Sequence, residues 1–365
     1  MANRPAEAAE SLDPEGLGLL GGCLAFSSNP VADLRRRLFA PGGFESVFRT
    51  AGNCRLLPVL AGELKRRALA PPIPQQTQAD GTLTSAAAIE QALADHATQR
   101  QRFSELLNEI IALLNQQGID PILLKGARSL WIGRPEWRGL RDLDILVAPQ
   151  EADRAERTLL ESGFGQLPDA HERPRHHHRT PLFRADSPGW VEIHVRGGNH
   201  YAERLLPTAE LVWAATTETR EGRRARLLSP VHHVLHAMIH HHAGHSAFAH
   251  GTMDIKGLYE FASELGDLDD AARRDVRHRA DAHPRLAAML DLWIAAAADL
   301  FGFVVSEPFA IDADATARWR DIRRRLTGAP AGGKLQGYAT EIAFASSTAR
   351  LRRQPGGGHG PGRLG

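Results

Sequence analysis

The sequence predicts an α+β protein in which a small mixed sheet with flanking helices is embedded between an N-terminal and a C-terminal helical region. Apolar residues recur at helical spacing in the first 68 residues and again from residue 229 onward. Between these regions, short strand patterns alternate with helix patterns over about 100 residues, a normal domain size. The length of 365 residues is too great for one simple core, which favours two or three substructures.

The predicted organisation follows changes in composition along the chain. Proline and small polar residues in 69–84 predict a linker, because they build no periodic apolar face. The first 12 residues, rich in Ala and Glu, are expected to fray, and the Gly-rich tail is expected to be disordered. The resulting regions are an N-terminal helical region (1–68), the linker (69–84), a sheet-containing core (85–228), a C-terminal helical domain (229–350) and the tail (351–365).

Apolar periodicity and capping residues predict the individual elements. A helix from residue 85 to Gln117 should end at Gly118, where a C-cap glycine belongs. Pro58 should interrupt the helical pattern of 44–64. Strands are expected at 121–124, 142–147, 180–184 and 190–196. Helices are expected at 127–132, 150–162, 231–242, 253–265, 270–283 and 286–301.

Bulk composition excludes several classes of protein. The formal net charge of +1 provides no global field for nucleic acid or an anionic membrane, although a local basic groove remains possible. Two cysteines are too few for a disulfide framework or a four-thiolate zinc site, so we expect a cytoplasmic protein. The apolar stretch 286–305 contains Asp291 and Asp299, which suits a buried helix pair better than a bilayer helix. No segment resembles a membrane span or a signal peptide.

The strand Asp142-Leu143-Asp144-Ile145-Leu146-Val147 is the most informative segment. Side chains alternate across a strand, so Asp142 and Asp144 share one face while Leu143, Ile145 and Val147 point into a core. A divalent cation relieves the repulsion between such carboxylates, and Mg²⁺ prefers carboxylate and phosphate oxygens. A solvated strand face near a sheet edge is the alternative explanation.

A second strand, 190–196, places Glu192, His194 and Arg196 on one face and three valine or isoleucine side chains on the other. If it lies beside the first strand, Glu192 supplies a third carboxylate for a two-metal phosphoryl-transfer site and a general base for a hydroxyl. The alternative for Glu192 is a surface ion pair with Arg196.

Lys125-Gly126 follows a predicted strand and precedes a predicted helix. Gly126 would let a phosphate approach the backbone, and Lys125 would add a positive charge for a triphosphate. An ordinary strand-to-helix turn explains the pair equally well. Arg138 and Arg141 either neutralise phosphate or pair with nearby acids.

Together these residues resemble the uncharacterised nucleotidyltransferase family of bacterial biosynthetic clusters, which belongs to the polymerase-β-like superfamily. The resemblance covers roughly residues 45 to 265, including Ser229-Pro230, His236, His240 and Asp254. The matching core residues are Leu124, Lys125, Gly126, Arg138, Asp142, Asp144 and Glu192-Ile193-His194.

The resemblance implies a polymerase-β-like core that binds an NTP with Mg²⁺ or Mn²⁺ through Asp142, Asp144 and Glu192. Lys125, Gly126, Arg138, Arg141 and His194 would contact the nucleotide. The product would be a nucleotidylated acceptor hydroxyl, on a small molecule, natural product or protein, with release of pyrophosphate. Lys125-Gly126 replaces the superfamily's usual Gly-Ser, and Glu192 stands where Asp is usual, so a non-catalytic nucleotide- or partner-binding member remains an alternative. An action on tRNA would need a basic groove, which the net charge disfavours.

Histidines are abundant, with 18 in the chain. His232, His236 and His240 recur at a spacing of four residues, which can bind zinc on a helix. No His-Glu-x-x-His motif is present and no nearby acid completes a ligand set, so packed or hydrogen-bonded histidines are favoured. His176-His177-His178 is expected to be a solvent-exposed loop rather than a site, with contact to substrate as the alternative. Asp254 is expected to have a structural role, as a helix cap or a histidine partner.

Overall fold

The computed structural model describes residues 12–26, 31–69, 85–133, 139–166, 177–244 and 252–328. Several expectations lie outside these ranges. They are the fraying of the first residues, most of the 69–84 linker, the 351–365 tail, and the positions of Arg138 and His176.

A seven-stranded mixed sheet forms the middle of the protein, with the strand order β3-β4-β5-β2-β1-β7-β6. Its central strand β2 pairs in parallel with β5 and antiparallel with β1. The strands are β1 (Ile122–Leu123), β2 (Asp142–Leu146), β3 (Gly165–Gln166), β4 (Leu182–Phe183), β5 (Trp190–His194), β6 (Thr216–Arg220) and β7 (Arg223–Leu227).

The two faces of the sheet have different environments. Leu143 and Ile145 of β2, with Val191 and Ile193 of β5, are fully buried in a core that also contains residues of α5 (Ser85–Gln116) and α7 (Ala152–Glu161). Because side chains alternate along a strand, the acidic side chains of β2 and β5 lie on the opposite face. The predicted α+β architecture and the predicted division between core and polar face are therefore confirmed.

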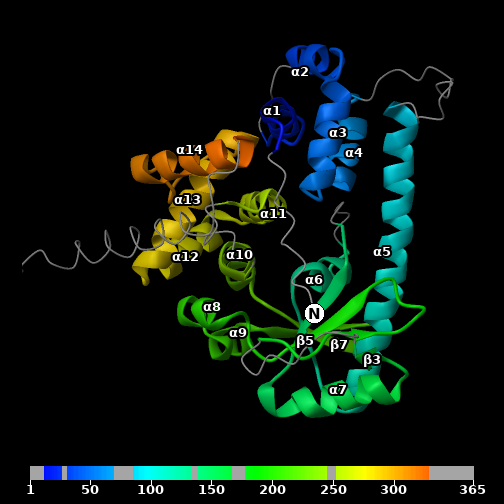
Figure 1. Cartoon of the computed structure of the whole chain (residues 1–365). Coiled ribbons are helices and arrows are strands. Elements are labelled where there is room, and N and C mark those ends of the chain that lie inside the picture. Colours follow the sequence, from blue (N-terminus) through cyan, green and yellow to red (C-terminus); the bar gives the residue numbers. More distant parts are fainter. Residues whose placement is uncertain are drawn as a thin grey trace, which may run out of the picture.

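The helical regions on either side of the sheet in sequence pack together in space. One hydrophobic core contains side chains from the first four helices and from α10 to α14, with a few sheet residues such as Leu146. Figure 1 shows these helices on the same side of the sheet, away from α7. The helices are α1 (Pro14–Cys23), α2 (Val31–Leu38), α3 (Gly43–Asn53), α4 (Leu57–Arg66), α10 (Pro230–Ile239), α11 (Ile255–Gly266), α12 (Asp270–Asp281), α13 (Pro284–Phe301) and α14 (Ala313–Thr327).

Local sequence signals explain most boundaries. The helical pattern of 44–64 is broken as predicted, and Pro58 lies in the first turn of α4, where its missing N–H costs nothing. Gly118 follows α5 with φ of +70°, a conformation that glycine adopts without strain. The helix predicted over 286–301 is confirmed as α13, and the stretch 286–305 contains this one helix rather than a helix pair. No helix among the described residues is long and apolar enough to cross a membrane.

Some elements escaped the sequence analysis. The hairpin of β6 and β7 is rich in polar residues, and β6 is mostly exposed, so neither strand shows a strong apolar pattern. Its turn at Glu221 and Gly222 has positive φ angles at both positions. Helices α8 (His200–Leu205) and α9 (Thr208–Ala214) are too short to show a clear period. Helix α14 is strongly charged, with only three buried residues, so its apolar stripe is weak.

Gly189 fixes the approach of β5 to β2. A Cβ at this position would lie 2.1 Å from the carbonyl oxygen of Arg141 and 2.7 Å from the ring of Phe103. We expect Gly189→Ala to force the strands apart and to lower the free energy of unfolding by about 1–3 kcal/mol, measured by urea denaturation. Gly139→Ala is the matched control, because a Cβ there meets nothing within 4 Å. Equal stability of the two variants would contradict this role.

Candidate active site

A cavity of about 560 Å³ opens over the acidic face of the sheet, a size typical of small-ligand sites. Its walls come from the sheet, from the α3–α4 junction, from α5 and from the C-terminal helical region. The lining residues are Gly52, Arg55, Leu57, Pro58, Gln99, Lys125, Gly126, Gly139, Leu140, Arg141, Asp142, Asp144, His177, His178, Glu192, His240, His241, Asp254 and Lys256.

The parallel pairing of β2 with β5 brings the predicted carboxylates together. Asp144 lies directly opposite Glu192 in the register, and Asp142 lies opposite Trp190. Because both strands present these positions on one face, Asp142, Asp144 and Glu192 all line the cavity. The condition on which the sequence prediction depended, that the second strand lies beside the first, is met.

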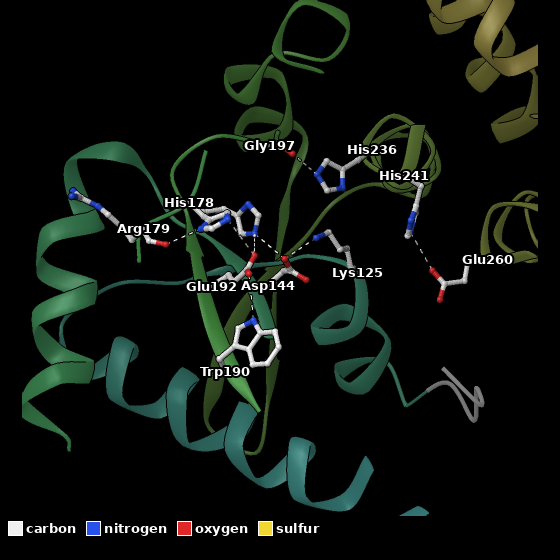
Figure 2. Close-up of polar contacts among 11 residues, drawn as sticks. Lys125, Asp144, His178, Arg179, Trp190, Glu192, Gly197, His236, His241 and Glu260 are labelled. Atoms are coloured by element: carbon white, nitrogen blue, oxygen red, sulfur yellow. Dashed lines mark hydrogen bonds and ion pairs between the residues drawn. The ribbon is translucent and has the colours of Figure 1, made fainter. Parts of the chain in front are cut away.

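Asp144 is the most buried of the three acids, with a side chain only 2% exposed. Its Oδ1 accepts a hydrogen bond from Lys125 Nζ at 2.7 Å (Figure 2) and another from His194 Nε2 at 2.8 Å. Burial acts to raise the pKa of Asp144, but Lys125 and His194 outweigh it and hold that pKa well below its usual value. Asp144 is therefore a buried anion that hydrogen bonds from Lys125 and His194 stabilise.

Glu192 is held by three neighbours rather than by Arg196, the partner expected in the ion-pair alternative. His194 Nε2 lies 3.5 Å and His178 Nε2 lies 3.7 Å from Glu192 Oε2, and the indole of Trp190 donates to Oε1 at 3.4 Å. Burial acts to raise the pKa of Glu192, but the hydrogen bond from His194 and nearby histidine charge lower it overall. The carboxylate is thus ionised and oriented toward the cavity.

Asp142 experiences the opposite balance. Burial and the neighbouring charge of Asp144 raise the pKa of Asp142 to about 6, and Lys125 offsets only part of this effect. A carboxylate kept in such a position without a matching cation destabilises the folded protein. Such strongly perturbed groups in a cleft are typical of functional sites.

His194, like Asp144, is almost completely buried. Burial acts to lower the pKa of His194, but its hydrogen bonds to Asp144 and Glu192 outweigh that effect and raise the pKa. His194 Nε2 therefore links the two carboxylates, at 2.8 Å from Asp144 Oδ1 and 3.5 Å from Glu192 Oε2.

Lys125 begins helix α6 (Lys125–Trp131), two residues earlier than predicted. Its φ of +44° is uncommon for a residue with a side chain, and its ammonium group points to Asp144. Gly126 lies beside it in the cavity wall. The structure therefore places Lys125 at the carboxylates, whereas the sequence analysis placed it at a triphosphate.

The donor atoms of this cluster fit a divalent cation. Asp144, Glu192 and His194 each offer one ligand atom, and these atoms lie within 4.8 Å of one another. Two carboxylates with an imidazole suit Mg²⁺ through oxygen, and Mn²⁺ through both oxygen and nitrogen. Among the described residues, this is the only group of at least three potential ligands that meets this distance.

The predicted arginines have different outcomes. Arg141 is exposed and lines the cavity beside Asp142. Arg138 lies outside the described residues.

The histidines of the C-terminal region are mostly packed, as the sequence analysis favoured. His236 Nε2 lies 2.7 Å from the carbonyl oxygen of Gly197, and the indole of Trp293 donates to His242 Nδ1 at 3.0 Å. Burial lowers the pKa of both imidazoles to about 3, so they are neutral at pH 7. In contrast, His177 and His178 line the cavity, and His178 contacts Glu192, so the expectation of a solvent loop is wrong for these two residues.

Sequence reasoning missed the helical walls of the site. Asp254 caps α11 and also lies 2.8 Å from His241 Nδ1, which satisfies both structural roles considered for it, yet it also lines the cavity. Lys256 lines the same wall and donates to the carbonyl oxygen of Gly139 at 3.2 Å. No local motif marks these residues, because they reach the site only through tertiary packing.

The fold and the paired carboxylate strands define a protein of the nucleotidyltransferase class. The model of the family described as "Uncharacterised nucleotidyltransferase" matches residues 42–302, well over half of the chain, so this chain belongs to that family. No curated protein matches the chain. Among solved structures, an antigenic nucleotidyltransferase-like protein from Paracoccidioides brasiliensis aligns with a TM-score of 0.29 and 16% identity, over 53% of this chain and 91% of that chain. A likeness at this level adds no argument on the site.

Proposed function

We propose that this protein transfers a nucleotidyl group from an NTP to an acceptor hydroxyl, in a reaction that depends on Mg²⁺ or Mn²⁺. One observation carries the proposal: three carboxylates from two adjacent parallel strands, Asp142, Asp144 and Glu192, face one cavity of ligand size. The family assignment supports nucleotidyl transfer in general. Because the substrate is an NTP, we expect the reaction to take place in the cytoplasm.

The position of each residue in the cavity suggests whether it would bind a metal ion or a phosphate. Asp144 and Glu192, with Asp142 beside them, would hold divalent cations, with His194 as a further ligand or as the group that orients both carboxylates. When bound, such cations neutralise the charge that develops on the phosphate oxygens. Lys125 would turn from Asp144 toward the phosphates once a cation compensates that carboxylate.

The proposed reaction joins the acceptor oxygen to the α-phosphorus of the NTP and breaks the bond from that phosphorus to the bridging oxygen of the β-phosphate. Pyrophosphate leaves with the bonding electron pair. The acceptor hydroxyl gives its proton to a carboxylate oxygen of Glu192, which lies beside His178 at the cavity wall. Arg141 stands at the same wall, where a phosphate tail would need positive charge.

The direct test is to incubate the protein with each NTP, with Mg²⁺ or Mn²⁺, and with a cell extract as the source of acceptor. We expect pyrophosphate release together with an acceptor whose mass increases by one nucleoside monophosphate. The absence of both products with every NTP and both cations would overturn the proposal.

One observation favours a second function, a non-catalytic nucleotide-binding role. Lys125 and His194 already compensate Asp144, as they would in a site that has no need of a metal. This alternative predicts saturable nucleotide binding that is unaffected by EDTA and is not followed by pyrophosphate release.

A further inference from the structure

Two arginines line the cavity without a charged partner among the described residues. Neither Arg55 nor Arg141 has a side-chain hydrogen bond or an ion pair with any part of the chain that the structure describes. By contrast, Arg184, elsewhere on the sheet, is paired with Glu109 at 2.6 Å. A guanidinium group that faces a ligand-sized cavity without such a partner is available to bind an anion.

The backbone presents Arg55 to the cavity at a conformational cost. Arg55 joins α3 to α4 with φ of +58°, in the left-handed region that L-residues avoid. Its neighbours in sequence, Cys54 and Leu56, are buried in the helical core and anchor the junction on both sides. Asn and Gly tolerate such a conformation better than Arg, so the turn alone does not explain an arginine at this position.

The same feature occurs at Lys125. Positive φ is found at four described residues other than glycine, Arg55, Ala68, Lys125 and Glu221, and the two cationic ones among them both line this cavity. Strained backbone that carries a charged side chain into one cleft from two distant parts of the chain is typical of a binding site.

The charged groups that line the cavity come from different parts of the fold. Three acidic groups, Asp142, Asp144 and Glu192, come from the sheet, where divalent cations would bind. A fourth, Asp254 at the start of α11, lies 2.8 Å from His241 Nδ1. Arg55 comes from the N-terminal helices. A ligand that satisfies both parts has a metal-binding end and a further anionic group. The polyphosphate of a nucleotide has this chemistry, and the planar guanidinium binds phosphate oxygens in a bidentate manner.

We propose that Arg55, with Arg141, binds the β- and γ-phosphates of the nucleotide, so that the N-terminal helical region completes the nucleotide site. This inference rests on the proposed function in so far as an NTP is the substrate. It assigns a substrate-binding role to a residue that lies far from the catalytic strands in sequence.

Binding of inorganic triphosphate and of an NTP, each with Mg²⁺, tests this inference by calorimetry without any turnover. We expect Arg55→Gln to weaken both ligands by about tenfold or more, and to change the affinity for a nucleoside monophosphate little. Arg35→Gln removes the same charge from an exposed site on α2 outside the cavity, and should leave all affinities unchanged. Arg55→Gly should fold at least as stably as the wild type, because glycine suits this φ, and should still lose triphosphate affinity.

Three results would overturn the inference: no triphosphate binding by the wild type, unchanged affinity in Arg55→Gln, or an equal loss for the monophosphate, which would place Arg55 at another part of the ligand. Failure of the proposed function has a different signature. In that case triphosphate binding would still depend on Arg55, while no pyrophosphate would be released with any acceptor source.

Discussion

Asp142→Asn is expected to reduce pyrophosphate release on the order of 1000-fold while leaving the free energy of unfolding unchanged or higher by about 1 kcal/mol. The amide removes a negative charge from a half-buried position next to Asp144, where that charge is repelled. It also removes one carboxylate from the face that would hold the cations. A substitution that harms activity and spares stability identifies a group retained for function.

The activity measurement uses the NTP, cation and extract that give the wild-type signal, and the stability measurement is urea denaturation in EDTA. Asp275→Asn, at an exposed position of α12, is the control for loss of one carboxylate and should change neither property. Wild-type turnover by Asp142→Asn would show that Asp142 is not part of the catalytic group.

Lys125→Met is expected to lower the free energy of unfolding by about 3–5 kcal/mol in the absence of divalent cations. The ammonium group compensates Asp144, and the two side chains are only 11% and 2% exposed. Without Lys125, the buried carboxylate retains, of its two hydrogen-bond partners in the described part of the chain, only His194. Denaturation in EDTA measures this loss, and the double variant Lys125→Met/Asp144→Asn should recover a large part of it, because it also removes the uncompensated charge.

The control for this experiment is Lys65→Met, which breaks the exposed pair between Lys65 and Glu90, whose side chains are 59% and 63% exposed. Its expected cost is below about 1 kcal/mol. Saturating Mn²⁺ should stabilise Lys125→Met more than the wild type, because a bound cation would compensate Asp144 in place of the ammonium group. A stability of Lys125→Met within about 1 kcal/mol of the wild type would contradict the account of this buried pair.

The sequence predicted the acidic face of the sheet because strand periodicity is a local property. Alternation in 142–147 and 190–196 separates carboxylates from apolar residues, and the structure confirms both faces. The pairing of these strands is not local. The pairing of the two strands depends on tertiary contacts, such as the close approach of Gly189 to Arg141, and no sequence motif predicts such contacts.

The sequence did not predict the helical walls of the site, because these walls also form only through tertiary contacts. No sequence motif marks Arg55, which joins two helices. Its proposed phosphate-binding role depends on a cavity that it lines together with residues about 90 positions later in the chain. His178 was misjudged because a run of histidines next to proline and arginine is typical of an exposed loop, whereas its bridge to His194 carries it into the site.

The central claim is that Asp142, Asp144 and Glu192 gather around a shared divalent cation, and Mn²⁺ binding followed by electron paramagnetic resonance tests it most directly. In the presence of a non-hydrolysable NTP, we expect the wild type to bind Mn²⁺ and Glu192→Gln to bind it at least about tenfold more weakly. Glu161→Gln, at an exposed position of α7, should bind as the wild type does. The claim is contradicted if the wild type binds no Mn²⁺ or if Glu192→Gln binds it with unchanged affinity.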